Sequence, residues 1–480
     1  MRIVITAVLL AVSTAISALM VGTLGFYDPK VGGVQLFVVG TIALWAVFAA
    51  ALVVSRGIPV RATVALVLIG SAALGGAAIT GPPNTSTDSA RYAWDGIVQT
   101  AGISPYDYVP ADPQLASLRP DWLFPAPIID SDGEAQCARA SGRFMTFEEV
   151  GTGDTLCSAI NRAPVPTIYP PVAEFIFFGA RVLLPADAKY WPMQLVGLLG
   201  ALVTTALLVR LLLRSGRDPR WAALWGWCPL VFSEGVTNSH IDIIGVVFVV
   251  VAAMLAAGGR GWRAGIALGL AIATKLIPVI AAPAMLGKQP VRVIVAAAAT
   301  FALCYVPYVI LSGIEVLGYL PGYLTEEGYD SGSRFVLLSP WFPGISAAIV
   351  AGLLIAVTAA FVWRLTDLAD PWLGQLAMIG VTLLVVSPRY PWYALLLIPM
   401  IAMTGRWEWL GVPAGLLVRL LSPGPQPTRL VLAAVVVMIV VVTVRRAGPA
   451  GLAVARDVAR HPMRTLRRGR PLPSDSLNAM

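Results

Sequence analysis

The sequence predicts an all-α, polytopic integral membrane protein, and three observations lead to this fold class. Of its 480 residues, 57% are hydrophobic and only 12% are charged, which is about half the charge of a typical soluble domain. Apolar runs of about 18 residues or more recur along the chain, and each is long enough to cross a bilayer about 30 Å thick. The apolar positions do not alternate with polar ones at every second residue, as they would in a transmembrane β-barrel.

About 12 transmembrane helices follow from the apolar runs and their polar ends. The first run, Met1–Phe26, lacks a clean small-residue cleavage site, so we interpret it as a span rather than a cleavable signal peptide. The predicted spans are 3–26, 33–54, 62–80, 192–213, 220–236, 240–258, 291–311, 341–363, 371–387, 391–404, 409–421 and 428–444.

Loop charges predict the side of the membrane on which each loop lies. The net charge is +8, and the tail from Arg445 to Met480 carries eight Arg and two Asp. With a cytoplasmic N-terminus, the basic or mixed loops fall inside, whereas the loop from Gly81 to Pro166, with eleven acidic residues and five Arg, falls outside. The basic tail favours anionic membrane lipid over nucleic acid as its partner, because no aromatic residues interleave its arginines.

This topology divides the chain into four parts. They are three N-terminal transmembrane helices (1–80), an extracytoplasmic loop (81–190), a transmembrane helical domain (191–444) and a basic cytoplasmic tail (445–480). Residues 172–184 cannot cross the membrane without inverting every later loop. They are short, with Glu174 and Arg181 near the two ends, so they are predicted to form an amphipathic helix on the outer surface.

The segment 262–286 has basic residues at both ends, so both ends are predicted to be cytoplasmic. Gly265, Gly269, Lys275 and Pro278 indicate a broken helix whose halves turn back near Lys275. Such backbone is tolerated at membrane depth where it lines a cavity or is buried in protein. The alternative is one ordinary span with a snorkelling lysine.

The four cysteines divide into two pairs. Cys228 and Cys304 lie inside apolar spans and are interpreted as core residues. Cys137 and Cys157 lie together in the long polar loop, where an extracytoplasmic location would allow a disulfide. Their shared loop favours the bridge, and the alternative is two free thiols.

A polar cluster begins just after the third predicted span. Thr87 or Asp88 is predicted to cap a short helix that runs to Thr100, and on this helix Tyr92, Asp95 and Gln99 share a face with Asp88. One explanation is a helix cap at a membrane interface. The adjacent Arg91 and the second acid favour another explanation, in which the carboxylate acts as general base on a sugar hydroxyl.

Two later stretches also combine unusual residues. Tyr169-Pro170-Pro171 gives the entry to the predicted surface helix a specific shape, although a stiff connector would also explain its prolines. The hairpin 234–242 places His240 beside acids that include Asp242. It is interpreted as a metal site, as a polar cluster that binds a sugar or phosphate, or as an ordinary outer turn.

Three isolated cations stand apart from the basic loops: Lys275, Arg334 and Arg389. Arg334 and Arg389 are predicted on the outer side, next to aromatic residues. Each alone is consistent with a side chain that snorkels to the interface. Together they could clamp a phosphate, for which the forked donors of arginine are well suited.

These pieces together resemble the GT-C glycosyltransferases, and more narrowly the bacterial polyprenyl-phosphate-mannose-dependent mannosyltransferases. The resemblance covers about residues 62–400. The pieces that carry it are Asp88-x-x-Arg91-Tyr92, Gly102-x-x-Pro105-Tyr106, Tyr169-Pro170-Pro171, Asn238-Ser239-His240-Ile241-Asp242, Thr274-Lys275-Leu276-Ile277-Pro278 and Pro388-Arg389-Tyr390-Pro391-Trp392-Tyr393.

The resemblance implies a GT-C-like fold whose large outer loop is catalytic and carries two interfacial helices, here 88–101 and 171–184. It implies an acidic loop residue as catalytic base, which falls on Asp88. In the family this loop usually follows the first span, so the first two predicted spans would be an N-terminal addition.

The implied function is transfer of a sugar, mannose first, from a polyprenyl-phosphate donor to a glycan or glycolipid acceptor. The reaction would invert the anomeric centre on the extracytoplasmic face of a bacterial plasma membrane. No cofactor is implied, and a divalent metal is left open. The residues assigned to substrate or donor phosphate are Arg91, Tyr92, Asp95, Tyr169, His240, Asp242, Lys275, Arg334 and Arg389.

Two other functions were weighed against transfer. A transporter or flippase for a lipid-linked sugar or small solute would place its ionisable groups near the membrane midplane, where Lys275 alone would suit it. A sugar-polymer ligase would carry its principal loop nearer the C-terminal half.

Overall fold

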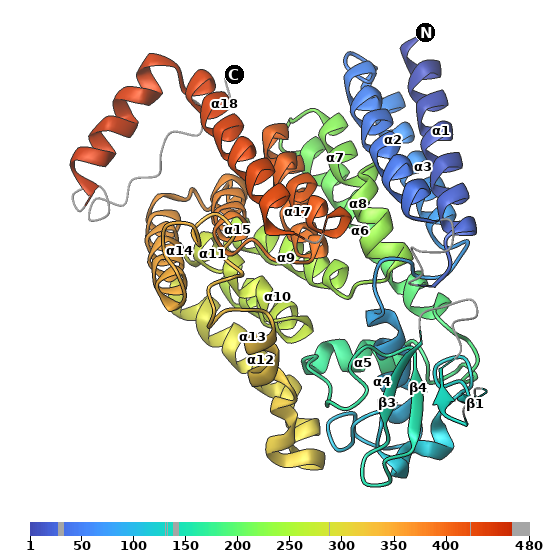
Figure 1. The fold of residues 1–480 in the computed structure, drawn as a ribbon. Coiled ribbons are helices and arrows are strands. Elements are labelled where there is room, and N and C mark those ends of the chain that lie inside the picture. Colours follow the sequence, from blue (N-terminus) through green and yellow to red (C-terminus); the bar gives the residue numbers. More distant parts are fainter. Residues whose placement is uncertain are drawn as a thin grey trace. The chain divides into compact units, whose positions relative to one another are not determined.

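A computed structural model of the protein describes residues 1–26, 33–129, 131, 133–137, 144–287, 289–422 and 424–462, and Lys288 and the end of the basic tail lie outside this described part. The described residues are mostly helical (Figure 1), which confirms the predicted all-α, multi-pass fold class. The chain forms two compact units. The first comprises Met1–Ile244, Ala273–Lys275 and Ala302–Pro321, and the second comprises Gly245–Ile272, Leu276–Phe301 and Gly322–Met480.

Seven of the described helices are long and apolar enough to cross a membrane. A helix pair bent by 118°, Pro229–Thr237 with Asp242–Ala257, would make an eighth if it is one broken span. The seven are Arg2–Thr23, Gly33–Val54, Val60–Ala78, Trp191–Arg214, Pro290–Leu317, Ile345–Leu365 and Pro425–Pro449.

The predicted count of about 12 spans is therefore not confirmed. The runs at 220–236, 391–404 and 409–421 form short or interrupted helices instead of continuous ones. Pro229 and Pro391 each begin a new helical turn inside such a run, because proline cannot donate a helical hydrogen bond. Apolar composition over so short a length does not separate a span from a buried core helix.

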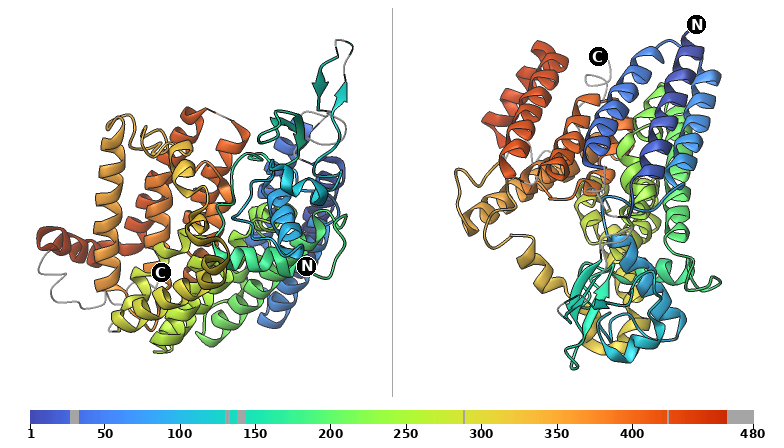
Figure 2. Two further views of the ribbon diagram at one scale, coloured as in Figure 1. Left: turned by 90° about the horizontal axis from the view of Figure 1, so that it is seen from below. Right: turned by 45° about the vertical axis from the view of Figure 1, so that its right-hand side comes forward.

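The first unit is built on three N-terminal helices that run side by side (Figures 1 and 2). Its remaining helices pack around them or form the long loop. The elements of this unit are α1 (Arg2–Thr23), α2 (Gly33–Val54), α3 (Val60–Ala78), α4 (Asp88–Thr100), η1 (Pro113–Leu118), α5 (Pro171–Gly179), α6 (Trp191–Arg214), η2 (Pro219–Ala222), α7 (Ala223–Gly226), α8 (Pro229–Phe232), the π-helical η3 (Ser233–Thr237), the start of α9 (Asp242–Ala257), the end of α12 (Pro290–Ser312) and η5 (Gly313–Leu317).

The long polar loop folds around α4 and α5, which pack against each other. Gly96 on α4 allows this approach, because a Cβ there would meet the carbonyl oxygen of Phe177 at 2.5 Å. The second helix ends at Gly179, short of the predicted 184. Two antiparallel hairpins, absent from the prediction, complete the loop: β1 (Ile128–Ile129) pairs with β2 (Ala135–Gln136), and β3 (Met145–Glu148) pairs with β4 (Thr155–Ser158).

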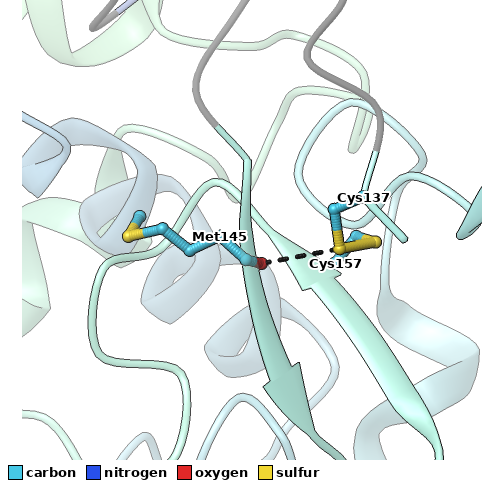
Figure 3. The surroundings of a disulfide bond; sticks show 3 residues. All are labelled: Cys137, Met145 and Cys157. Carbon is cyan, nitrogen blue, oxygen red and sulfur yellow. Dashed lines mark hydrogen bonds between the residues drawn. A yellow bond between two sulfur atoms is a disulfide. The ribbon is translucent and has the colours of Figure 1, made fainter. Parts of the chain in front are cut away.

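A disulfide joins the residue just after β2 to the second hairpin. It joins Cys137 to Cys157 on β4, and the Cys137 sulfur also lies 3.9 Å from the carbonyl oxygen of Met145 on β3 (Figure 3). Both cysteines lie in the long polar loop, whose sequence favours a bridge over two free thiols. On the chain-entropy model, closing a loop of this length stabilises the fold by about 3 kcal/mol.

The second unit is also helical, and its long C-terminal helix bends at Gly448, where φ is +60° (Figure 1). The predicted tail is thus helical as far as Arg460. The remaining elements, several of which begin at prolines, are α10 (Gly261–Thr274), η4 (Ile277–Ala281), α11 (Pro283–Leu286), α13 (Leu320–Glu326), α14 (Ile345–Leu365), α15 (Trp372–Val386), η6 (Pro391–Leu396), α16 (Ile398–Thr404), η7 (Trp407–Leu410), α17 (Gly411–Leu421) and α18 (Pro425–Arg460).

Candidate active site

Asp88 is the first residue of α4. The residue before it, Thr87, makes no side-chain capping bond, while the backbone N–H of Asp88 donates to Ser86 Oγ at 3.1 Å. The Asp88 side chain is 19% exposed. The side chain is therefore partly exposed, and its charged neighbours His240, Lys275 and Arg162 come from other parts of the chain.

The His240 ring lies between the carboxylates of Asp88 and Glu234. Its Nδ1 lies 3.5 Å from Asp88 Oδ2, and its Nε2 lies 3.3 Å from Glu234 Oε2. Both His240 and Glu234 are buried. When His240 carries its second proton, both of its N–H groups can donate to carboxylates. The imidazole thus fixes the position of the Asp88 carboxylate, which is partly exposed, whereas Glu234 is buried.

The turn that carries His240 has an irregular backbone. It follows the π-helical η3, and Ser239 adopts φ +50°, a left-handed conformation that is uncommon for residues other than glycine. Gly197 on α6 lets this turn approach closely, because a Cβ there would lie 2.1 Å from the carbonyl oxygen of Gly235. Such features cluster at functional sites, where the surrounding fold holds them in place.

Asn238 ties this turn to the segment that leads into α4. The backbone N–H groups of Asn84 and Thr85 both donate to its Oδ1 at 2.9 Å, and Thr85 Oγ1 donates to the Glu234 carboxylate at 3.2 Å. The chain on either side of the Asp88–His240 contact is therefore fastened by hydrogen bonds. Asp88 and His240 meet because the two segments are bonded, and not through their own contact alone.

Positive charges surround the Asp88 carboxylate. Burial by itself would raise the pKa of Asp88, but the hydrogen bond from His240 and the charges of His240, Lys275 and Arg162 together lower it below its ordinary value. Lys275, which follows the end of α10, donates to Asp242 Oδ2 at 2.6 Å. Asp88 is consequently an ionised carboxylate at neutral pH, as a general base must be.

Arg91 and Asp95 belong to a separate, buried network. Arg91 Nε donates to Asp95 at 3.1 Å, and its Nη1 donates to the carbonyl oxygen of Val165 at 3.0 Å. Asp95 shares a hydrogen bond with Glu174, which is fully buried. Burial is the largest cause that raises the pKa of Asp95 and of Glu174, and the Asp95 charge raises the pKa of Glu174 further.

Neutral donors complete this network. Thr167 Oγ1 donates to Glu174 at 2.8 Å, Gln99 Nε2 donates to the same carboxyl at 3.0 Å, and Tyr308 donates to Gln99 at 2.7 Å. Burial and the Asp95 charge both favour the protonated form of Glu174. Their contacts link α4, α5 and α12 within the first unit.

Tyr92, one helical turn after Asp88 on α4, packs against Tyr169. Their rings meet edge to face with centroids 5.0 Å apart, and Phe177 stacks on Tyr92. Both tyrosines are buried. Burial and the charges of Asp88 and Asp242 raise the pKa of Tyr92. Tyr92 therefore stays neutral.

The remaining two predicted cations belong to the second unit. Arg334 is buried, pairs with the buried Glu327, and lies over the ring of Tyr329 at 4.6 Å. Arg389 precedes η6 and is partly buried. The structure thus brings four predicted site residues together in the first unit, namely Asp88, His240, Asp242 and Lys275.

Sequence reasoning did not assign Glu234, Asn238 or Arg162 to the site. Glu234 and Asn238 stand in the same hairpin as His240, so the signal was their position within one short polar turn between apolar runs. Arg162 carried no local signal, since only the folded loop places its charge near Asp88. Within the described residues, no group of three or more His, Cys, Asp or Glu is arranged to hold a metal ion.

Comparison with known protein families supports a membrane glycosyltransferase of a GT-C-like kind. The matching family is glycosyltransferase family 87, whose sequence profile aligns with residues 167–388. This range is a little under half of the chain. It contains Tyr169, His240 and Lys275, and it leaves out Asp88 and Arg389. No curated protein and no solved structure matches the chain.

Proposed function

We propose that this protein transfers a sugar, with mannose the first candidate, from a polyprenyl-phosphate donor to a glycan or glycolipid acceptor. The transfer takes place on the extracytoplasmic face of a bacterial plasma membrane, and both termini are cytoplasmic. The observation that carries the proposal is the contact between Asp88 and His240, which holds an ionised, partly exposed carboxylate at the start of α4. The family 87 match, which includes His240, supports the reaction class.

Asp88 acts as the general base in this mechanism. One carboxylate oxygen of Asp88 takes the proton of the acceptor hydroxyl while the hydroxyl oxygen attacks the anomeric carbon. The bond from the anomeric carbon to the phosphate oxygen breaks, and its electron pair stays on the phosphate. A single displacement of this kind inverts the anomeric centre. General base catalysis contributes about 10²–10⁴ in rate.

Nearby groups keep Asp88 in its reactive form and position. His240 orients the carboxylate, and Lys275 and Arg162 supply positive charge that keeps it ionised. The leaving phosphate gains one negative charge, so it needs cations rather than a proton donor. We assign that role to arginine and lysine side chains, and we propose that no metal ion is required.

The test is a transfer assay with purified protein. Polyprenyl-phosphate-mannose and an α-mannoside acceptor should give an elongated product whose new linkage is inverted relative to the donor, and the Asp88→Asn variant should give none above background. A panel of polyprenyl-phosphate sugars identifies the natural donor. Uptake of labelled solute into vesicles, with no glycan product from any donor, would contradict the proposal and favour transport.

A further inference from the structure

A group of arginines in the second unit is not explained by packing. Arg334 lies in the segment after α13, Arg389 lies before η6, and Arg419 lies on α17. The charge of Arg419 interacts with those of Arg389, Arg334 and Glu327, so the three guanidinium groups share one neighbourhood. Arg419 was not singled out by the sequence and lies outside the family 87 match.

Hydrogen bonds and packing hold the three segments together. Tyr323 on α13 and Tyr393 on η6 join through their hydroxyl groups at 2.9 Å, and α17 packs against η6. The stretch after Arg334 is fastened by Arg429 on α18, which donates to the carbonyl oxygen of Val336 at 2.9 Å. The arginines are therefore parts of a built site and not mobile surface side chains.

Each of the three arginines keeps a buried N–H nitrogen without a hydrogen-bond partner among the described residues: Nε of Arg334, Nε of Arg389 and Nη1 of Arg419. Arg334 is only 3% exposed. Buried polar groups are nearly always hydrogen-bonded, and leaving one unpaired costs free energy. Three such donors in one neighbourhood indicate a common acceptor that the protein itself does not supply.

The charges point to the same conclusion. Three guanidinium groups carry three positive charges, and Glu327 is the acid that pairs with Arg334. Close like charges in a buried setting are unfavourable unless an anion balances them. Two positive charges remain, which match a phosphate monoester dianion better than a phosphodiester monoanion. Forked guanidinium donors suit phosphate oxygens.

We propose that Arg334, Arg389 and Arg419 form a phosphate site that prefers a monoester dianion. The identification of this monoester as a lipid phosphate rests on the proposed transfer. In that transfer the donor is a phosphodiester, and the leaving polyprenyl phosphate is a monoester. A site with two net positive charges then binds the product-like charge more strongly than the donor.

The test is a binding measurement that involves no sugar. Citronellyl phosphate is titrated into purified protein in detergent, with citronellol and inorganic phosphate as separate titrations. In wild type we expect citronellyl phosphate to bind more tightly than citronellol. In Arg419→Gln and Arg389→Gln we expect its Kd to rise about 10- to 100-fold, as for loss of a charge-assisted hydrogen bond, with citronellol unchanged.

Two further variants make the result specific. Arg364→Gln on α14 removes an exposed arginine from the same unit and should bind like wild type. Arg419→Lys keeps the charge without the fork and should lie between wild type and Arg419→Gln. The arginine dependence of the inorganic phosphate titration shows whether the headgroup alone is recognised or the lipid as well, and either pattern supports the site.

Equal Kd values in wild type, Arg419→Gln and Arg419→Lys would overturn the proposal. Its failure is distinguishable from that of the proposed function. If glycosyl transfer is observed but phosphate binding does not depend on the arginines, the phosphate site is wrong and the proposed function stands. If citronellyl phosphate binding depends on the arginines but no donor gives a glycan product, the phosphate site stands and the proposed function is wrong.

Discussion

Nδ1 of His240 lies 3.5 Å from Oδ2 of Asp88, although a long stretch of sequence separates the two residues. This contact joins a turn between two apolar helices to the first residue of the long loop's first helix. It lowers the pKa of the Asp88 carboxylate, which is partly exposed.

Asp88→Asn should lower the transfer rate about 10²- to 10⁴-fold, because an amide of the same shape cannot accept the acceptor's proton. The measurement is the initial rate at saturating donor and acceptor. Asp107→Asn is the matched control, since Asp107 is exposed in the same loop and should keep the wild-type rate. Equal rates in Asp88→Asn and wild type would remove the assigned base.

His240→Gln should change the pH dependence as well as the rate. In wild type the pKa of Asp88 is already below its ordinary value, so its ionisation adds no acid limb above about pH 5. Without His240, burial dominates and the pKa of Asp88 rises, so an acid limb should enter the measured range. Rate profiles from about pH 5 to about pH 8 test this. An unshifted profile with a reduced rate would mean that His240 acts only on structure.

Glu174→Gln should stabilise the protein at high pH. Burial and the Asp95 charge raise the folded-state pKa of Glu174, so the folded state binds more protons than the unfolded state, and wild-type stability falls as pH rises above the unfolded value of about 4.3. A glutamine at this position mimics the protonated acid and does not titrate, so it does not lose stability as the pH rises. Its melting temperature should exceed that of wild type most at high pH, and the difference should shrink toward about pH 5.

Two comparisons make the Glu174 result interpretable. Glu148→Gln, at an exposed position on β3, should show no such pH-dependent gain. Glu174→Ala should be destabilised by about 1–3 kcal/mol, because Thr167 and Gln99 lose their acceptor. A Glu174→Gln variant less stable than wild type at every pH would contradict the raised pKa of Glu174.

Removal of the disulfide should lower stability by about 3 kcal/mol. The double variant Cys137→Ser, Cys157→Ser tests this by thermal melting. Reductant should lower the melting temperature of wild type and leave that of the double variant unchanged, which separates the bridge from other effects of the reductant. A wild-type melting temperature insensitive to reductant under denaturing conditions would contradict a stabilising role.

Treatment with EDTA should leave the transfer rate unchanged. The reason is that lysine and arginine side chains are proposed to balance the charge of the leaving phosphate, as a metal ion does in other phosphate-dependent enzymes. The rate is measured before and after chelation and dialysis. Loss of activity with recovery on added Mg²⁺ or Mn²⁺ would show that the side chains are not sufficient.

The sequence supported the fold class and the long spans, because a bilayer needs about 20 apolar residues in a row and composition reports them directly. It was less reliable for the shorter apolar runs. The run at 391–404 became η6 and α16 rather than one helix, since apolar character does not say whether a proline starts a turn inside it. The small sheets were missed because their strands are only two to four residues long.

For the site, the sequence by itself identified Asp88 and His240 as unusual, because ionisable groups beside apolar spans are costly and need a reason. Helical spacing placed Asp95 on the face of Asp88. Only tertiary structure decided that Asp88 meets His240, while Asp95 pairs with Arg91 and Glu174 instead. Spacing reports which side chains share a helix face, but partners from distant segments are set by how those segments pack and bond.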